Sequence, residues 1–323
     1  MVQQEIKMAK IKIVADSACD IGFDTAKKYN IELIPMNIFF GDEKYKEGIN
    51  IDSQECYDRI ANAKSIWPTT SQPSPREFYN AYTKIFDDGY ETILSIHVSS
   101  QLSGTLNSVN AAKNMFPGKD IIAIDSKTAT HAFGLMVIEA AKLAKKGKTK
   151  EEILTRLKNS YIPNARVCGV VETLEYLHRG GRIGRAKKIL GNLFNKKPLI
   201  QVKDGLVDSF GTSKGFEEGF NNFVKMAPII FDNLNTDRVI LGYASDDQHT
   251  QEFYEILKDL PNRPKNLEVK MIGPAIGVHL GPGALTIAWI GNWDELWYGS
   301  NLEYLSSTST LASSTSGQTS SHQ

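Results

Sequence analysis

The stretch ETILSIHVSSQLSGTLNSVNAAKNMF, residues 91–116, decides the fold. It predicts a buried strand over 91–98 and a helix over 103–116, joined by a short hydroxyl-rich segment. The pattern then repeats, with DIIAID (120–125) as a strand and residues 130–146 as a helix. Strands separated by helices of this length are typical of βαβ units, so we expect an α/β fold with a mainly parallel sheet.

The same alternation extends to both sides of this stretch. Upstream, KIKIVAD (10–16) and IELIPMNIFF (31–40) predict strands, and 52–63 predicts a helix. Ser74, Pro75 and Glu77 form a capping-box pattern at the start of a predicted helix over 74–89. Another helix is expected over about 150–160, ending before Pro163.

A second block of elements begins near residue 165. Asp204-Gly205 is a two-residue turn signal, so residues 197–210 predict a hairpin. The boundary is expected near Pro163-Asn164, which gives an α/β domain over 1–164 and another over 165–300. The further expected elements are strands at 166–174, 238–244, 267–273 and 284–290 and helices at 182–195, 213–231 and 247–259.

The C-terminal segment differs in composition from the rest. Twelve of the eighteen residues 306–323 are Ser or Thr, and none is Asp, Glu, Lys or Arg. Such a segment buries too little apolar surface to offset its ordering entropy. Residues 301–323 are therefore predicted to be a disordered tail.

Composition excludes several classes of protein. The chain has 323 residues, 37 basic and 37 acidic, so its zero net charge argues against a protein that binds nucleic acid over its whole surface. The three cysteines form no CxxC pair, and the first twenty residues contain no long apolar run typical of a signal peptide. We therefore expect a cytoplasmic protein with reduced thiols.

Residues 271–293 contain no charged side chain, but five glycines and two prolines make a membrane-spanning helix a poor interpretation. A buried loop leading into the strand at 284–290 is expected instead. His279 lies in the middle of this glycine-rich loop. A histidine in such a place is either structural or functional, and the residues alone leave both open.

Hydroxyl residues gather where strands end or helices begin. They can bind an anion together with free helix N–H groups, because ligands of parallel sheets lie beyond the carboxyl ends of the strands. They can equally be helix caps, which Ser and Thr favour. The four clusters are Asp16-Ser17, 69–74, 99–105 and 125–128.

A basic segment, residues 176–203, carries eight Lys or Arg and no Asp or Glu. A solvated helix face explains most of them, while contact with nucleic acid, an anionic membrane or an acidic partner is the functional alternative. No interleaved aromatic residues support binding to single-stranded nucleic acid, and no nucleic-acid partner is expected. Arg182 stands apart because it lies within the glycine run 180–184, which matches neither GxGxxG nor a P-loop.

The chain shows no HExxH or GxSxG, and its histidines do not pair at metal spacing, so no metal site and no complete catalytic group is predicted.

Taken together, these motifs resemble the DegV family, in the expected order from residue 14 to 284. The matching pieces are VADSACDI, TSQPSP (70–75), SSQLSGTLNSV (99–109), IDSKTAT (124–130), LEYLHRGGRIG (174–184), KPL (197–199) and IGPAIGVHLGPGA (272–284).

The resemblance implies two α/β domains with mainly parallel sheets and a long-chain fatty acid in the cleft between them. Such proteins serve as the acyl-binding subunit of a bacterial fatty acid kinase, with no catalytic site or cofactor of their own. A separate ATP-binding kinase phosphorylates the carboxylate, and the acyl-phosphate feeds phospholipid synthesis. By motif match, Thr70 and Ser103 hold the carboxylate with Gly104 close by, and Arg182 and His279 lie near the head group, facing the partner.

Physical reasoning supports a lipid ligand. Burying about fifteen methylenes yields roughly 12 kcal/mol of gross binding free energy, at about 0.8 kcal/mol each, before association costs.

The sequence leaves two alternative functions open. One is an enzyme acting alone on a small anionic metabolite, with His279 as acid–base or nucleophile. The other is a lipid-responsive regulatory protein whose basic segment contacts nucleic acid or a membrane.

Overall fold

A four-stranded sheet with the order β2-β1-β6-β7 forms the centre of the N-terminal half. The computed structural model describes residues 10–62, 67–191, 195–246 and 248–295. Every neighbouring pair in this sheet is parallel, which confirms the α/β prediction for this half. Its strands are β1 (Ile11–Asp16), β2 (Ile31–Ile34), β6 (Thr92–His97) and β7 (Asp120–Asp125).

The single strand predicted over 31–40 is wrong, because the chain breaks into two strands at Pro35. β2 joins the parallel sheet, whereas β3 (Asn37–Phe40) pairs with β4 (Glu43–Lys46) and β5 (Thr69–Ser71) in a small antiparallel sheet. Proline has no N–H for a sheet ladder, so the chain leaves the first sheet there. The break places Thr70, on β5, away from the parallel sheet.

A six-stranded sheet with the order β10-β9-β8-β13-β11-β12 forms the C-terminal half. Only β11 and β12 pair in parallel, so the prediction of mainly parallel sheets fails for this sheet. The turn Asp204-Gly205, with φ of 52° and 82°, folds β9 directly back onto β10 as predicted. The strands are β8 (Ala165–Val170), β9 (Lys197–Lys203), β10 (Leu206–Ser213), β11 (Leu234–Tyr243), β12 (Asn266–Met271) and β13 (Leu285–Gly291).

Most predicted helices form, with ends shifted by a few residues. The capping box at Ser74 is present, with Ser74 and Glu77 bonded to each other's backbone N–H. The helices are α1 (Phe23–Lys28), α2 (Ser53–Asn62), α3 (Pro75–Asp87), α4 (Thr105–Lys113), α5 (Thr130–Lys145), α6 (Lys150–Arg156), α7 (Ile162–Asn164), α8 (Glu175–Arg179), α9 (Gly215–Asp232), α10 (Gln248–Lys258) and α11 (Pro274–Leu280).

Three helix predictions need correction. The helix expected to end before Pro163 continues through a π-helical turn (Leu157–Tyr161) into α7, which contains Pro163 and ends at Asn164. The helix predicted over 182–195 is only a 3₁₀ helix at Gly184–Ile189, with 192–194 outside the described residues. The expected loop before β13 contains α11, with Pro274 in its first turn and Gly281, at φ 81°, as its C-cap.

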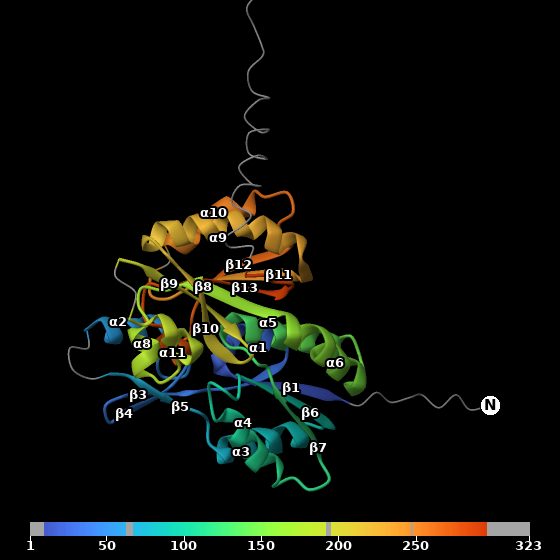
Figure 1. The fold of residues 1–323 in the computed structure, drawn as a ribbon. Helices are drawn as coiled ribbons and strands as arrows, with labels where there is room; N and C mark the ends of the chain where they lie inside the picture. Colours follow the sequence, from blue (N-terminus) through green and yellow to red (C-terminus); the bar gives the residue numbers. More distant parts are fainter. Residues whose placement is uncertain (1–9, 63–66, 192–194, 247, 296–323) are drawn as a thin grey trace, which may run out of the picture.

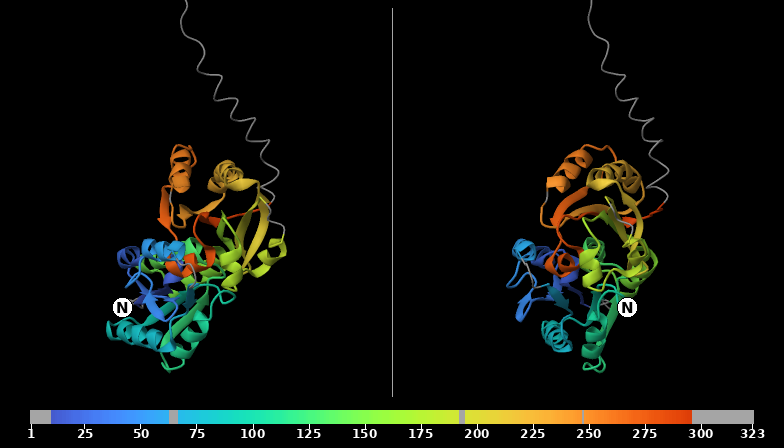
Figure 2. Two further views of the ribbon diagram at one scale, coloured as in Figure 1. Left: turned by 90° about the vertical axis from the view of Figure 1, so that its left-hand side faces the viewer. Right: turned by 60° about the vertical axis from the view of Figure 1, so that its left-hand side comes forward.

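The two large sheets stack with helices between and outside them (Figure 1). α5 packs against β1 on one side and against β8 and β13 on the other. Eleven of its sixteen residues are buried, because both sheets cover it. Helices α3 and α4 cover the outer face of the parallel sheet, and α9 and α10 cover that of the six-stranded sheet, at opposite ends of the molecule in Figure 2.

The strands of the two large sheets divide at Ala165, but α11 crosses the division. It lies between β12 and β13 in sequence, yet contacts α2, β3 and β5 of the N-terminal half. The domain boundary at 164/165 stays a prediction. The predicted tail, residues 301–323, lies outside the described residues. Among the residues that are described, no helix is both long and apolar enough to cross a membrane.

Candidate functional site

A narrow cavity of about 110 Å³ lies between the two large sheets. This volume is below the range of about 300–1,000 Å³ usual for small-molecule sites, so a long ligand must widen the cavity. Both halves of the chain contribute to its wall, which is mainly aliphatic. The apolar lining includes Met36, Val98, Leu102, Val167, Leu177, Ile200, Val202, Val207, Ile276 and Leu280.

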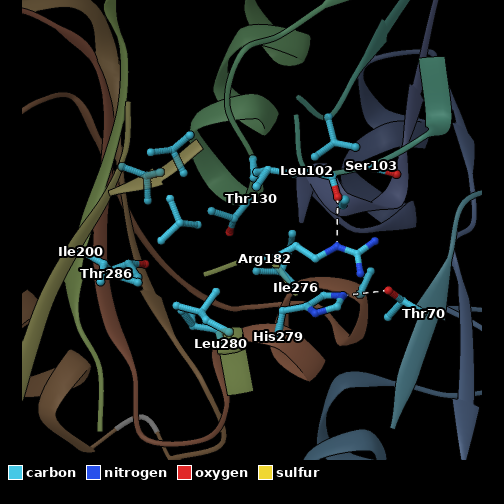
Figure 3. A pocket seen from close by; sticks show the side chains of 18 of the residues that line it. Thr70, Leu102, Ser103, Thr130, Arg182, Ile200, Ile276, His279, Leu280 and Thr286 are labelled. Atoms are coloured by element: carbon cyan, nitrogen blue, oxygen red, sulfur yellow. Dashed lines mark hydrogen bonds between the residues drawn. The ribbon is translucent and has the colours of Figure 1, made fainter. Parts of the chain in front are cut away.

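Polar side chains gather at one end of this cavity (Figure 3). Thr70 comes from β5, Ser103 from the segment before α4, Arg182 from the glycine run after α8, and His279 from α11. The structure therefore brings together four of the five predicted site residues. Gly104 does not line the cavity. It is the N-cap of α4, and a Cβ there would lie 2.9 Å from Nε2 of Gln72, which does line the cavity.

His279 is held in the neutral state. Burial, together with the nearby Arg182 charge, lowers its pKa to about 4. Its Nε2 shares a 2.8 Å hydrogen bond with Thr70 Oγ1. Its Nδ1 lies against Gly180, where any Cβ would clash with the ring. When Nε2 carries the proton and donates it to Thr70, the Thr70 hydroxyl proton is free for a ligand.

Arg182 brings a positive charge to the same end. Its Nε donates to the Leu102 carbonyl at 3.1 Å and its Nη1 to the Gly180 carbonyl at 2.7 Å. Gly181, at φ 71°, turns the chain just before Arg182. Within the described ranges no carboxylate lies within ion-pair distance of the Arg182 guanidinium, so its charge is available to an anion.

Ser103 lies just before the first turn of α4. Its Oγ is 2.8 Å from Thr105 Oγ1 and accepts the Thr105 N–H at 3.3 Å. The helix predicted from 103 therefore starts at 105, and Ser103 lies at the cavity instead of inside the helix. Its hydroxyl can donate to a ligand while its oxygen still accepts from the protein.

Most of the other clustered hydroxyls are structural. Ser17 donates to Glu47, Ser99 donates to the Gly205 carbonyl at 2.7 Å, and Ser126 donates to the Thr128 carbonyl at 3.1 Å. The two interpretations of these clusters thus apply to different residues. Thr70, Ser71 and Ser103 line the cavity, while Ser17, Ser99 and Ser126 hold loops in place.

The basic segment is partly neutralised by acidic residues from elsewhere in the chain. Arg185 pairs with Asp204 at 3.0 Å, and Lys188 pairs with Asp208 at 3.1 Å, both acids from the hairpin. Lys203 pairs with Glu295 at 2.7 Å. Lys187 and Lys188 remain exposed to solvent.

Sequence reasoning missed a pair of buried carboxyl groups behind the cavity wall. Glu47 accepts the Ala275 N–H at 3.0 Å, and Asp20 accepts the Thr130 hydroxyl at 2.7 Å. Burial raises the pKa of Glu47 to about 7 and raises that of Asp20. The pair ties the start of α11 to the N-terminal half. These acids are 27 positions apart, so only the fold reveals them.

No metal centre is found among the residues that the structure describes, since no three His, Cys, Asp or Glu side chains are grouped to hold an ion. The three cysteines are buried and unpaired, and burial raises their pKa values. They have none of the exposure that reactive cysteines need.

Comparison with known proteins identifies relatives along almost the whole described chain. A DegV domain-containing protein of Clostridium perfringens is 32% identical over 287 residues, covering 87% of this chain and 98% of the relative. Another from Deinococcus radiodurans is 32% identical over 279 residues, covering 86% and 97%.

Solved structures agree. A DegV family protein from Thermus thermophilus, described by its fatty acid binding, superposes with a TM-score of 0.80 at 28% identity, covering 88% of this chain and all of that one. DegV of Bacillus subtilis, described as a fatty acid binding protein, gives 0.79 at 28% identity with the same coverage. A stearic acid-binding protein from Eubacterium ventriosum gives 0.75 at 28% identity, covering 87% and 98%.

The family model described as "Uncharacterised protein, DegV family" matches residues 10–292, which span both large sheets and every residue at the polar end of the cavity. This chain belongs to the DegV family.

Proposed function

We propose that this protein binds a long-chain fatty acid in the cavity between its sheets. The single observation that carries the proposal is the asymmetry of the cavity, which has an aliphatic wall and one end furnished with Thr70, Ser103, Arg182 and His279. A fatty acid has the same asymmetry, with one anionic end and an apolar chain. The relatives from T. thermophilus, B. subtilis and E. ventriosum support this assignment.

The carboxylate is assigned to the polar end. Hydroxyl donors on Thr70 and Ser103 bind one oxygen or both, and the Arg182 charge stabilises the anion from nearby. Arg182 donates its Nε–H and one Nη1–H to carbonyls, so these two N–H groups are not available to the carboxylate. A carboxylate held mainly by neutral donors keeps an oxygen lone pair that can attack phosphorus.

The protein then presents this carboxylate to a separate ATP-dependent kinase. A carboxylate oxygen forms a bond to the γ-phosphorus of ATP, the bond to the β-phosphate oxygen breaks, and ADP leaves. The acyl-phosphate product is carried towards phospholipid synthesis. In this proposal the protein is a cytoplasmic ligand-binding subunit without a catalytic site or cofactor of its own. The exposed Lys187 and Lys188 support transient contact with an anionic membrane.

A stand-alone enzyme fits the site less well. The Thr70–His279 pair resembles a nucleophile and its base, but such pairs need a third group that orients the base. His279 Nδ1 has no hydrogen-bond partner in the described part of the chain, and it faces a glycine. The geometry therefore favours a binding role for His279.

Native mass spectrometry of the purified protein tests the binding step. We expect a bound acid of the C14–C18 range at one molecule per chain, removed by delipidation and restored by adding palmitate or oleate. A protein that is empty and cannot be loaded would contradict the proposal. Decanoate serves as a control, because fewer buried methylenes mean weaker binding.

The presentation step is tested with Arg182→Ala and the partner kinase. The variant should keep its lipid, as measured by mass, and lose most of the acyl-phosphate formed per minute. Lys187→Ala is the control, since this exposed residue lies in the same basic segment outside the cavity lining. Phosphorylation at the normal rate in Arg182→Ala would refute the partner-facing role.

A further inference from the structure

A polar spot interrupts the aliphatic wall at a place remote from the carboxylate-binding end. Thr286, on β13, lines the cavity beside Ile200, across from Thr70, Ser103 and Arg182 in Figure 3. The residue is only 4% exposed, and its hydroxyl oxygen has no hydrogen-bond partner in the described structure. A buried hydroxyl without a partner costs about 1–3 kcal/mol, so the position calls for a physical reason.

Two glycines open the sheet on both sides of this hydroxyl. Gly169 on β8 and Gly242 on β11 pair directly with Thr286 in the strand register. A Cβ at Gly242 would clash with Thr286 Oγ1, and one at Gly169 would lie 2.7 Å from the Thr286 methyl. Glycine weakens a strand interior, and it often marks a place where a ligand approaches the backbone closely.

A second buried polar group lies against the same glycine. His131, on α5, is fully buried behind the cavity lining, with a hydrogen bond to the Met271 backbone. Its Nδ1 lies 2.8 Å from the point where a Gly242 Cβ would be. Burial lowers its pKa to about 3, so the ring is neutral and offers one donor and one acceptor.

We propose that Thr286, with His131 behind it, marks a second polar subsite, at which the Thr286 hydroxyl binds a hydroxyl group carried on the acyl chain of a hydroxylated fatty acid. The chemistry favours a hydroxyl over a second carboxylate. The Thr286 hydroxyl can both donate and accept a hydrogen bond, which matches a group that does both, whereas a carboxylate only accepts. This inference rests on the proposed function, because it assumes an acyl chain running from the polar end along the cavity.

A scan of hydroxystearate isomers tests the subsite. Stearate and its 2-, 6-, 10-, 12- and 17-hydroxy derivatives are titrated into the delipidated protein by competition with a fluorescent fatty acid. We expect one isomer, or two adjacent ones, to bind about tenfold more tightly than stearate. The other isomers should bind more weakly than stearate, since they bury a hydroxyl against aliphatic residues.

Thr286→Val should abolish this preference and leave stearate binding at least as tight, because valine keeps the shape and loses the hydroxyl. Thr286→Ser is the matched control and should retain the preference. If no isomer is favoured over stearate in the wild-type protein, the subsite is refuted, whatever the variants do. If the preference survives Thr286→Val, the hydroxyl is recognised elsewhere and the assignment is refuted.

The test separates this inference from the proposed function. Failure of stearate itself to bind would overturn the proposed function. Binding of stearate without any positional preference would overturn the subsite alone. Should Thr286→Val fail to fold, the wild-type isomer scan still decides, since a single favoured position supports the subsite and a flat profile refutes it.

Discussion

Two buried histidines, His97 and His279, show how differently this chain uses the same side chain. His97 lies on β6 beneath α3, where its ring meets Phe78 edge-on at 5.2 Å. Its Nδ1 bonds to Asp16 at 2.9 Å, and its Nε2 bonds to Ser95 at 2.7 Å. Both nitrogens therefore have protein partners.

The groups around His97 are also satisfied. Asp16 accepts N–H groups from Val98 at 3.0 Å and from Ala18 at 3.2 Å, and Ser95 bonds to Tyr82 at 2.7 Å. His279, by contrast, has one partner, Thr70, and an unpaired second nitrogen. The comparison teaches that a complete set of internal hydrogen bonds marks a structural cluster, and spare capacity beside a cavity marks a ligand site.

Removing the centre of the complete network should have the largest effect. Asp16→Ala leaves two backbone N–H groups and His97 without their acceptor, so we expect a loss of about 3–5 kcal/mol in the free energy of unfolding. Urea unfolding measures it. Asp16→Asn, which keeps one acceptor oxygen, should lose less. A loss below about 1 kcal/mol for Asp16→Ala would show that the network does not stabilise the fold.

The next largest effect should come from the buried Asp20–Glu47 pair, which makes the free energy of unfolding depend on pH. The pKa of Glu47 rises from 4.5 in the unfolded chain to about 7 when folded. Because folding raises this pKa, protonated Glu47 stabilises the folded state fully below pH 4.5. This contribution to the free energy of unfolding is lost as pH rises to about 7. The shift corresponds to about 3 kcal/mol, at about 1.36 kcal/mol per unit.

Glu47→Gln tests this, because glutamine mimics the protonated acid and does not titrate. Between pH 5 and pH 8, the wild-type protein should lose up to about 3 kcal/mol more unfolding free energy than the variant. Glu55→Gln is the control for an exposed acid on α2. Parallel pH profiles for wild type and Glu47→Gln would contradict the raised pKa of Glu47 in the folded protein.

At the polar end of the cavity, where hydrogen-bonding groups are left for a ligand, a substitution should affect binding more than stability. Ser103→Ala removes a hydrogen bond to a charged carboxylate, worth about 1.5–3 kcal/mol, so palmitate should bind about 10- to 150-fold more weakly in calorimetric titrations. Ser126→Ala, whose hydroxyl bonds only to the protein, should leave affinity unchanged. Equal affinities for wild type and Ser103→Ala would remove Ser103 from the carboxylate site.

The smallest effect concerns the protonation of His279. With a pKa of about 4, this ring is neutral throughout pH 5.5–8. The affinity of the wild-type protein for palmitate should therefore change by less than about twofold across that range. The same titration of His279→Gln gives the change that does not depend on this ring. A tenfold loss of affinity as pH rises through 6.5 would show that the ring binds the carboxylate in its charged form.

The sequence predicts local structure well where chain-neighbouring residues decide it. The Asp204-Gly205 turn, the Ser74 capping box and the strands of the parallel sheet all depend on residues within a few positions of one another. Pro35 shows where this fails, because its effect on strand pairing depends on which sheet lies beside it. α11 was missed because five glycines and two prolines masked a short helix that packing stabilises.

The polar end of the cavity could be predicted because each of its residues belongs to a distinctive motif. The subsite at Thr286 could not. It depends on Gly169 and Gly242 flanking Thr286 across three strands. Strand register across 117 positions, from 169 to 286, is not encoded in any local pattern. The same is true of Asp20 and Glu47.

A crystal structure of the protein loaded with palmitate tests the central claim most directly. We expect the carboxylate within about 3 Å of Ser103 Oγ and Thr70 Oγ1, a hydrogen-bond distance, with the chain running past Leu280 towards Thr286. A palmitate bound in the reverse direction, or outside the cavity between the sheets, would contradict the assignment of this cavity to a fatty acid.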